Sequence, residues 1–122
     1  MIGYVTLGTN DLERGAQFYD QLLKEIGASR FMETDGFIAW TIAPDKPALS
    51  LTKAFDGKPA TVGNGVMVAL AMRSPDQVDS FYKKAMELGA TDEGKPGPRG
   101  DGFYAGYFRD LDGNKLNAFC MG

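Results

Sequence analysis

The 122-residue sequence contains no histidine and only one cysteine, Cys120. Without histidine the chain lacks the imidazole that serves as a common metal ligand and as the base of Ser–His and Cys–His pairs, so those nucleophilic arrangements are excluded. A single cysteine cannot form a disulfide within the chain. That usage is typical of a reducing compartment, and we expect the protein to be cytoplasmic.

Long apolar runs and clusters of basic residues are also missing. No apolar stretch reaches membrane-spanning length, and the first ten residues lack the basic segment of a secretory signal. Lys83-Lys84 is the only basic pair, and 13 basic against 16 acidic residues give a net charge of −3. Because binding to nucleic acid needs a basic patch, we expect neither nucleic acid nor a membrane as a partner.

The residues needed for a folded core are present. Apolar residues make up 43% of the chain and include eight Phe, five Tyr and one Trp, which is enough for one domain spanning residues 1–122. The 16 glycines are spread along the chain rather than gathered in one tract. This distribution indicates many tight turns between short strands.

The first half of the chain predicts a strand, a helix and three strands. Asn10 or Asp11 can cap the helix, whose apolar residues recur at helical spacing from Leu12 to Ile26, and Gly27 ends it. Turns at Thr34-Asp35-Gly36 and at residues 44–47 separate the later strands. The expected strands are Ile2–Gly8, Ser29–Glu33, Phe37–Ile42 and Ala48–Thr52.

The second half repeats this order after a linker over residues 55–63. Ser74 and Pro75 are a good N-cap and first residue of a helix that Gly89 ends. Residues 95–102, rich in glycine and proline, are expected to be a loop, and residues 110–114 the turn of a hairpin. The expected strands are Val66–Met72, a short Ala90–Glu93, Phe103–Arg109 and Lys115–Met121.

The two halves also correspond in their letters. Phe18-Tyr19 matches Phe81-Tyr82, and Gly27-Ala28 matches Gly89-Ala90. Such an internal repeat fixes the architecture. We therefore predict an α+β protein made of two βαβββ modules, residues 1–54 and 64–122, in which Tyr4 superposes on Met67 and Ser50 on Asn117.

Side-chain alternation along the strands predicts a binding face. Residues such as Leu7, Leu51 and Phe108 belong to the helix-covered faces, so their neighbours point the other way. Those neighbours mix polar and apolar groups, as the wall of a ligand pocket does. The alternative is a sheet face that is partly exposed to solvent and binds no ligand, or one that is buried between subunits. The predicted cavity is lined by Tyr4, Thr6, Ser50, Thr52, Met67, Tyr107, Asn117 and Phe119, with Arg99 at its mouth, where Arg99 either binds an acidic group or pairs with Asp101.

The whole chain resembles the vicinal oxygen chelate superfamily, which includes glyoxalase I, bleomycin-resistance proteins and extradiol dioxygenases. The resemblance rests on the two modules, on Tyr4-Val5-Thr6-Leu7 followed by Asn10-Asp11-Leu12, and above all on the segment from Tyr107 to Leu116, YFRDLDGNKL. It implies a curved mixed sheet with a concave pocket, often completed by subunit pairing, so we expect a homodimer.

Metal-dependent members of that superfamily carry ligands at positions that correspond here to Tyr4, Met67, Ser50 and Asn117. None is a usual ligand of a catalytic divalent metal. We therefore expect no metal and no cofactor, although a cation held by other carboxylates, among Glu33, Asp101, Asp110 and Asp112, stays open.

The function that we infer is a metal-independent site for a small molecule. The protein would be a binding protein of the drug-resistance type, or a lyase or isomerase that works without a metal. A glyoxalase-like metal enzyme or dioxygenase with displaced ligands is the first alternative. A non-catalytic interaction module is the second, since one fold hosts many functions.

Overall fold

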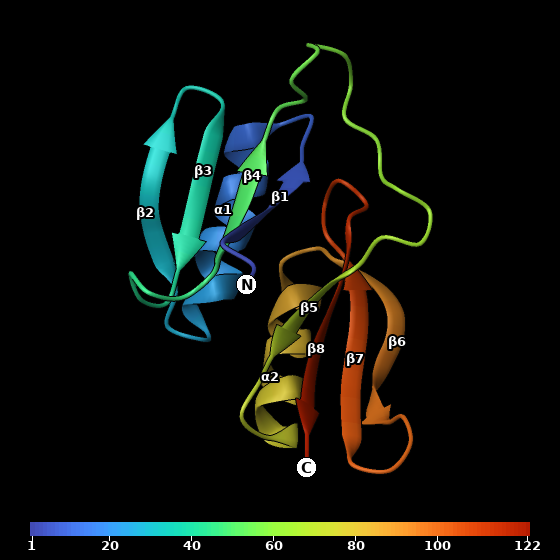
Figure 1. Cartoon of the computed structure of the whole chain (residues 1–122). Coiled ribbons are helices and arrows are strands. Elements are labelled where there is room, and N and C mark those ends of the chain that lie inside the picture. Colours follow the sequence, from blue (N-terminus) through green and yellow to red (C-terminus); the bar gives the residue numbers. More distant parts are fainter. The chain divides into compact units, whose positions relative to one another are not determined.

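The structure, a computed structural model, describes all 122 residues and divides into two compact units, Met1–Val62 and Gly63–Gly122. Each unit contains one strand, one helix and three further strands in that order, which confirms the two βαβββ modules (Figure 1). The division between the units falls in the predicted linker. The assignment of the whole chain to one domain, with repeats over residues 1–54 and 64–122, stays a prediction.

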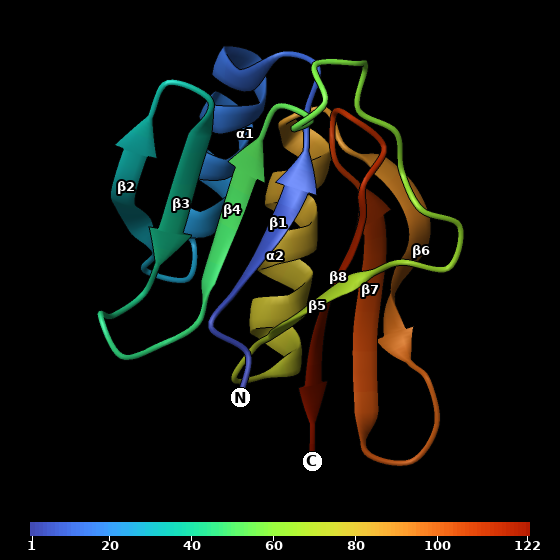
Figure 2. The same cartoon turned by 45° about the horizontal axis from the view of Figure 1, so that its top comes forward.

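The first unit is a four-stranded mixed sheet with one helix. Strands lie in the order β1-β4-β3-β2, with β1 parallel to β4 and the other neighbours antiparallel. Helix α1 covers one face of this sheet (Figures 1 and 2). The elements are β1 (Tyr4–Gly8), α1 (Leu12–Lys24), β2 (Ser29–Thr34), β3 (Phe37–Thr41) and β4 (Ala48–Thr52).

The second unit repeats the plan. Its strands lie in the order β5-β8-β7-β6, again with one parallel pair, β5 and β8, and with α2 on one face. The elements are β5 (Val68–Ala71), α2 (Pro75–Glu87), β6 (Thr91–Pro98), β7 (Phe103–Arg109) and β8 (Lys115–Met121). Both helices have 13 residues, and neither is long enough and apolar enough to cross a membrane.

Strand β6 corrects the sequence-based expectation for residues 90–102. We expected a short strand over Ala90–Glu93 and then a loop, whereas β6 continues to Pro98. It tolerates glycine and proline because it is the edge strand of its sheet, where an absent N–H breaks no inner hydrogen bond. Its register with β7 shifts between Asp92 and Gly94 and again between Gly94 and Gly97, so bulges absorb the irregular residues.

Side chains and glycines fix the ends of both helices as expected. The Asp11 carboxylate accepts a hydrogen bond from the Arg14 backbone N–H at 3.1 Å, so Asp11, rather than Asn10, is the N-cap of α1. The Ser74 hydroxyl caps α2 in the same way. Gly27 and Gly89 follow the two helices with φ of 79° and 102°, a left-handed conformation that favours glycine.

Each unit has its core between its helix and its sheet. In the first, Tyr19 of α1 packs against Trp40 of β3 with ring centroids 5.7 Å apart, and both are 1% exposed. In the second, the rings of Phe81 and Phe108 lie 6.2 Å apart, and both are fully buried. These pairs establish which face of each sheet the helix covers, and Trp40 lies on that face of the first sheet.

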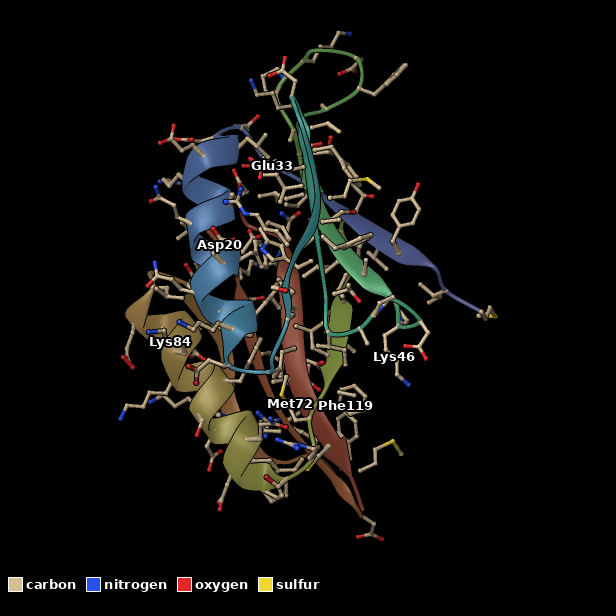
Figure 3. All side chains as sticks on the ribbon, turned by 90° about the vertical axis from the view of Figure 1, so that its left-hand side faces the viewer. Asp20, Glu33, Lys46, Met72, Lys84 and Phe119 are labelled. Atoms are coloured by element: carbon tan, nitrogen blue, oxygen red, sulfur yellow. The ribbon has the colours of Figure 1, made fainter.

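An ionic network ties α1 to its sheet. Asp20 receives two hydrogen bonds from the Arg30 guanidinium, at 2.8 and 2.7 Å, and one from the indole N–H of Trp40 at 2.8 Å. Figure 3 shows Asp20 on α1 beside the strands. The hydrogen bonds from Arg30, together with the one from Trp40, hold the pKa of Asp20 below its ordinary value against the opposing effect of burial.

This network makes stability depend on pH. Because the pKa of Asp20 is lower in the folded state, its contribution is complete above the unfolded-state value, about 4, and is lost as the pH falls through the folded value. Both side chains of the pair are about a third exposed, so solvent screens it. We expect Asp20→Asn to lower the free energy of unfolding at pH 7 by about 1 kcal/mol, and this difference to shrink in acid.

Denaturant titrations followed by the fluorescence of Trp40, the single tryptophan, measure this effect at neutral and acid pH. Asp101→Asn is the matched control, since Asp101 is exposed in a turn and belongs to no ion pair. An equal loss of stability in both variants, or a loss in Asp20→Asn that is unchanged in acid, would contradict the role assigned to the network.

Candidate functional site

The faces of the two sheets that their helices leave uncovered carry the residues predicted to bind a ligand. Strand register places Thr6 opposite Ser50 in the first sheet and Ala69 opposite Asn117 in the second. Ser50 and Asn117 therefore occupy equivalent places, each on the last strand beside the first, as the internal repeat predicts. The same register makes Met67, just before β5, the counterpart of Tyr4.

In the first unit the polar groups of this face bond to one another. The Ser50 hydroxyl donates to the Val5 carbonyl oxygen at 2.8 Å and lies 3.0 Å from the Thr6 hydroxyl. The Thr52 hydroxyl is within 2.9 Å of the Gly36 carbonyl oxygen. Tyr4 is 64% exposed and meets Phe37 edge to face. Most hydrogen-bonding capacity of the predicted residues in this unit is therefore already used.

In the second unit one polar group has no partner. Asn117 is 1% exposed, and its side-chain oxygen Oδ1 is buried without a hydrogen bond. A buried polar group normally has a partner, because leaving it unpaired costs about 1–3 kcal/mol. The residue opposite it on β5, Ala69, offers none. The equivalent positions of the two units therefore differ: the Ser50 hydroxyl has hydrogen-bond partners, whereas Oδ1 of Asn117 has none.

Tyr107 lies directly across the ladder from Asn117 on the same uncovered face. The Arg99 guanidinium carbon is 5.5 Å from the centre of its ring, and the Lys115 ammonium nitrogen is 5.6 Å from it. Arg99 donates to the backbone oxygens of Lys95 and Pro98, and it forms no ion pair with Asp101, the alternative partner considered from the sequence. Tyr107 thus lies beside both Asn117 and Arg99, and their shared role in a binding site stays a prediction.

Phe119 completes this cluster with an aromatic surface. Its ring stacks on that of Phe103, with centroids 5.7 Å apart and planes at 23°, and both residues are partly exposed. Figure 3 shows Phe119 on the side of β8 away from α2. Met67 precedes β5 and is 39% exposed. The ligand-binding role of the nine residues stays a prediction, although those that lie in strands follow the expected alternation.

Lys115 is the residue of this cluster that sequence reasoning missed. It stands two residues before Asn117, so the alternation that assigned Asn117 to the uncovered face also assigns Lys115 to it. The signal was therefore present in the sequence, but contact with Tyr107 depends on the side-chain conformation.

The positions where the superfamily's metal ligands would fall do not suit a divalent metal. They hold a phenol, a thioether, a hydroxyl and an amide at Tyr4, Met67, Ser50 and Asn117, and the hydroxyl of Ser50 is engaged with Val5. No group of three or more cysteine and carboxylate side chains is arranged to hold a metal ion elsewhere in the structure.

Two of the carboxylates considered for a displaced cation, Asp110 and Glu33, have other roles. Asp110 is 4% exposed, and its carboxylate accepts hydrogen bonds from the backbone N–H groups of Asp112 and Asn114, each at 2.9 Å. It therefore organises the hairpin turn that the sequence predicted over residues 110–114. Glu33 pairs with Arg30 at 3.1 Å.

Two tyrosines on α2 and β7 are held protonated by their surroundings. Burial and a 2.6 Å hydrogen bond to Asp92 raise the pKa of Tyr82 to about 12. The hydrogen bond from Tyr104 to Asp79, at 2.7 Å, raises the pKa of Tyr104 in the same direction. Such phenols serve as structural donors and are poor proton donors to a substrate near neutral pH.

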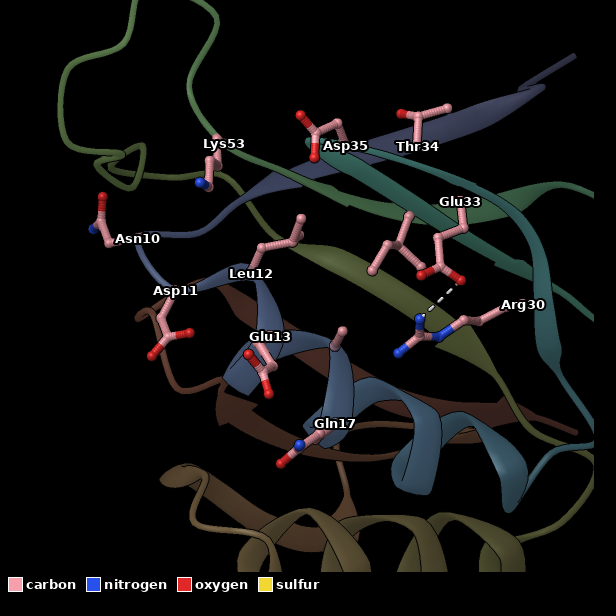
Figure 4. A pocket seen from close by; sticks show the side chains of 12 residues that line it. Asn10, Asp11, Leu12, Glu13, Gln17, Arg30, Glu33, Thr34, Asp35 and Lys53 are labelled. Carbon is pink, nitrogen blue, oxygen red and sulfur yellow. Dashed lines mark ion pairs between the residues drawn. The ribbon is translucent and has the colours of Figure 1, made fainter.

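Each unit also has a surface cleft that sequence reasoning did not anticipate. In the first unit a cleft of about 570 Å³ lies between the start of α1 and the β2–β3 hairpin. Figure 4 shows Asp11 and Glu13 on one side of it and the Arg30–Glu33 ion pair on the other. Since acidic and basic side chains both line it and several already have partners, the cleft does not select one sign of charge.

The cleft of the second unit, about 330 Å³, is bordered by Arg73, Tyr104, Cys120 and Met121. Cys120 lies opposite Tyr104 in the strand register and is partly exposed. None of the nine predicted ligand residues borders either cleft. Those that belong to strands lie on the uncovered sheet faces instead, so the clefts are separate features.

Comparison with solved structures shows the same fold in proteins of one family. A glyoxalase/bleomycin resistance protein from Albidiferax ferrireducens T118 is 36% identical over 100% of this chain and 99% of its own, with a TM-score of 0.92. Hypothetical protein SA1046 from S. aureus is 25% identical, over 98% and 92% of the two chains, with a TM-score of 0.75. The fosfomycin resistance protein FosX from Listeria monocytogenes shares the fold at 17% identity, over 100% and 93%, with a TM-score of 0.76.

No curated protein matches the chain. Residues 1–118, however, match the family model of the Glyoxalase/Bleomycin resistance protein/Dioxygenase superfamily. The two βαβββ modules, the solved relatives and this match agree, and the chain belongs to the glyoxalase/bleomycin resistance protein/dioxygenase superfamily.

Proposed function

We propose that this protein binds a small molecule on the uncovered face of its second sheet without the help of a metal. It acts as a binding or sequestering protein of the resistance type, or as a metal-independent lyase or isomerase. The observation that carries this proposal is the buried, unpartnered Oδ1 of Asn117, because a bound ligand that supplies a hydrogen bond would remove its cost. The solved relative that is 36% identical is a glyoxalase/bleomycin resistance protein, which also supports a small-molecule ligand.

The residue types at the four superfamily metal positions, Tyr4, Met67, Ser50 and Asn117, support metal independence. We therefore expect less than stoichiometric metal by elemental analysis after exposure of the purified protein to zinc, nickel, manganese and iron. The reason is that phenol, thioether, hydroxyl and amide groups compete poorly with water for these ions. One tightly bound metal ion per subunit would overturn this part of the proposal and favour a metal enzyme with displaced ligands.

Two neighbouring residues on β8 give a matched pair of variants. Leu116 is fully buried and shares the strand face of Phe108, whereas Asn117 points to the opposite, uncovered face. We expect Asn117→Leu to keep or raise stability, because it removes an unpaired amide, and to weaken ligand binding about tenfold. We expect Leu116→Asn to cost about 3 kcal/mol, because it buries a polar group and removes core contacts.

Thermal melts of both variants, with and without a ligand found by screening, test the assignment. Ser50→Ala is the control for the first unit, since its hydroxyl bonds within the sheet and its loss should leave ligand affinity unchanged. Unfolding of Asn117→Leu together with tolerance of Leu116→Asn would mean that the faces are inverted. Failure of every compound to bind would favour an interaction module.

Exposed apolar side chains support a second proposal, that the protein is a homodimer in the cytoplasm. Tyr4 and Met121 are 64% and 74% exposed on uncovered sheet faces. A small protein gains by covering such surface, and closed two-fold pairs are the commonest way to do so. We expect light scattering at micromolar concentration to give the mass of two chains; a mass of one chain would contradict the dimer. The single cysteine supports the cytoplasmic location.

A further inference from the structure

We propose that the uncovered face of the second unit recognises an organic acid that also carries a hydroxyl group. This inference rests on the proposed function, because it names the class of molecule held at that face. The anionic group lies beside the ring of Tyr107, within reach of Arg99 and Lys115, and the hydroxyl meets the amide of Asn117. The shared chemistry of the anion is that of a carboxylate or a phosphonate.

The two cations flank Tyr107 from opposite sides. Lys115 belongs to β8, on one side of β7, whereas the Arg99 guanidinium lies against β6 on the other side, next to Gly94 and Gly97. A Cβ atom on Gly97 would stand 3.1 Å from Nη1 of Arg99, so the glycine leaves the space that this group occupies. Both cationic groups lie within cation–π distance of the Tyr107 ring.

Neither cation has an acidic partner, although the chain as a whole is acidic. The third cation of this face, Arg109, pairs with Glu93 at 3.2 Å and also donates to the Gly113 carbonyl oxygen. Arg99 and Lys115 form no such pair. Two uncompensated positive charges beside one ring favour an anion, and the guanidinium has N–H groups to spare beyond its two backbone bonds.

Asn117 defines the second requirement. A side-chain amide offers an acceptor and donors, and a hydroxyl group can both donate and accept, so a ligand hydroxyl satisfies whichever atom faces it. A carboxylate or phosphonate dianion alone only accepts and leaves Oδ1 unpaired. In the first unit Ser50 has its hydrogen bonds within the sheet, and no cation–π contact lies beside it. Only the second unit therefore offers both a site for an anion and an unpaired amide for a hydroxyl group.

The remaining surface of this face suits the carbon skeleton of such an acid. Phe103 and Phe119 stack on one another and are partly exposed, which offers a flat apolar surface beside Asn117. Tyr107 and Lys115 are also only partly buried. A ligand reaches the amide by moving these side chains, without disturbing the backbone of the sheet.

Isothermal titration calorimetry with four probes tests both requirements on the full chain. The probes 4-hydroxybenzoate and (4-hydroxyphenyl)phosphonate carry the anion and the hydroxyl, 4-methoxybenzoate lacks the donor, and methyl 4-hydroxybenzoate lacks the charge. We expect each incomplete probe to bind about tenfold more weakly than 4-hydroxybenzoate. The two complete probes decide between a carboxylate and a phosphonate as the preferred anion.

Charge-removing variants locate the anion. We expect Arg99→Gln and Lys115→Gln each to weaken 4-hydroxybenzoate about tenfold and to leave methyl 4-hydroxybenzoate within twofold, roughly the difference between a lost charge-assisted bond and none. Lys83→Gln on α2 changes the net charge equally but lies on the helix that covers the opposite face. It should leave all affinities unchanged.

The outcomes separate this inference from the function on which it rests. Equal affinity for the charged and the esterified probe, or for the hydroxyl and the methoxy probe, overturns the inference. So does an equal effect of Lys83→Gln and Arg99→Gln, which would indicate long-range attraction only. If no probe binds while the ligand found by screening still depends on Asn117, the inference fails and the proposed function stands. If neither binds, both fail.

Discussion

Each sheet of this protein has only one helix to cover it, and that helix buries only one of the two faces. Because side chains alternate along a strand, covering one face commits every second residue to the other. Trp40 and Leu51 are thereby drawn into the first core, and Phe108 and Leu116 into the second. The residues between them are released from the need to pack against a helix, and these are the residues available for function.

The two units use this common frame for different purposes. In the first unit the hydrogen-bonding groups of the uncovered face satisfy one another. The Ser50 hydroxyl bonds to a backbone oxygen of the neighbouring strand and lies within hydrogen-bond distance of the Thr6 hydroxyl. The second places a longer amide at the equivalent position, opposite an alanine that cannot bond to it. A repeated scaffold has thus kept its core in both halves, whereas only one half retains an unmet hydrogen bond.

Local patterns in the sequence were enough for the elements whose order depends on near neighbours. The caps at Asp11 and Ser74, the turn at Asp110 and the alternation that separates Tyr107 from Phe108 all act over a few residues. Contacts between residues distant in the sequence could not be predicted from these local patterns. The bond from Trp40 to Asp20 requires β3 to face α1, and the contact of Lys115 with Tyr107 requires a particular side-chain conformation.

Strand β6 is the segment whose secondary structure was hardest to predict from the sequence, and it also matters for the site. Glycine and proline have low strand propensity because both disfavour regular pairing, so a strand rich in them is not predicted from its sequence. Here they are compatible with pairing because β6 is an edge strand with bulges, and their small or fixed shapes are used. Gly97 leaves room for the Arg99 guanidinium, and Pro96 packs 2.9 Å from where a Cβ on Gly106 would stand. The glycine and proline content that makes this strand hard to predict therefore also lets the Arg99 guanidinium lie beside Tyr107. A more regular strand with larger side chains would displace that guanidinium.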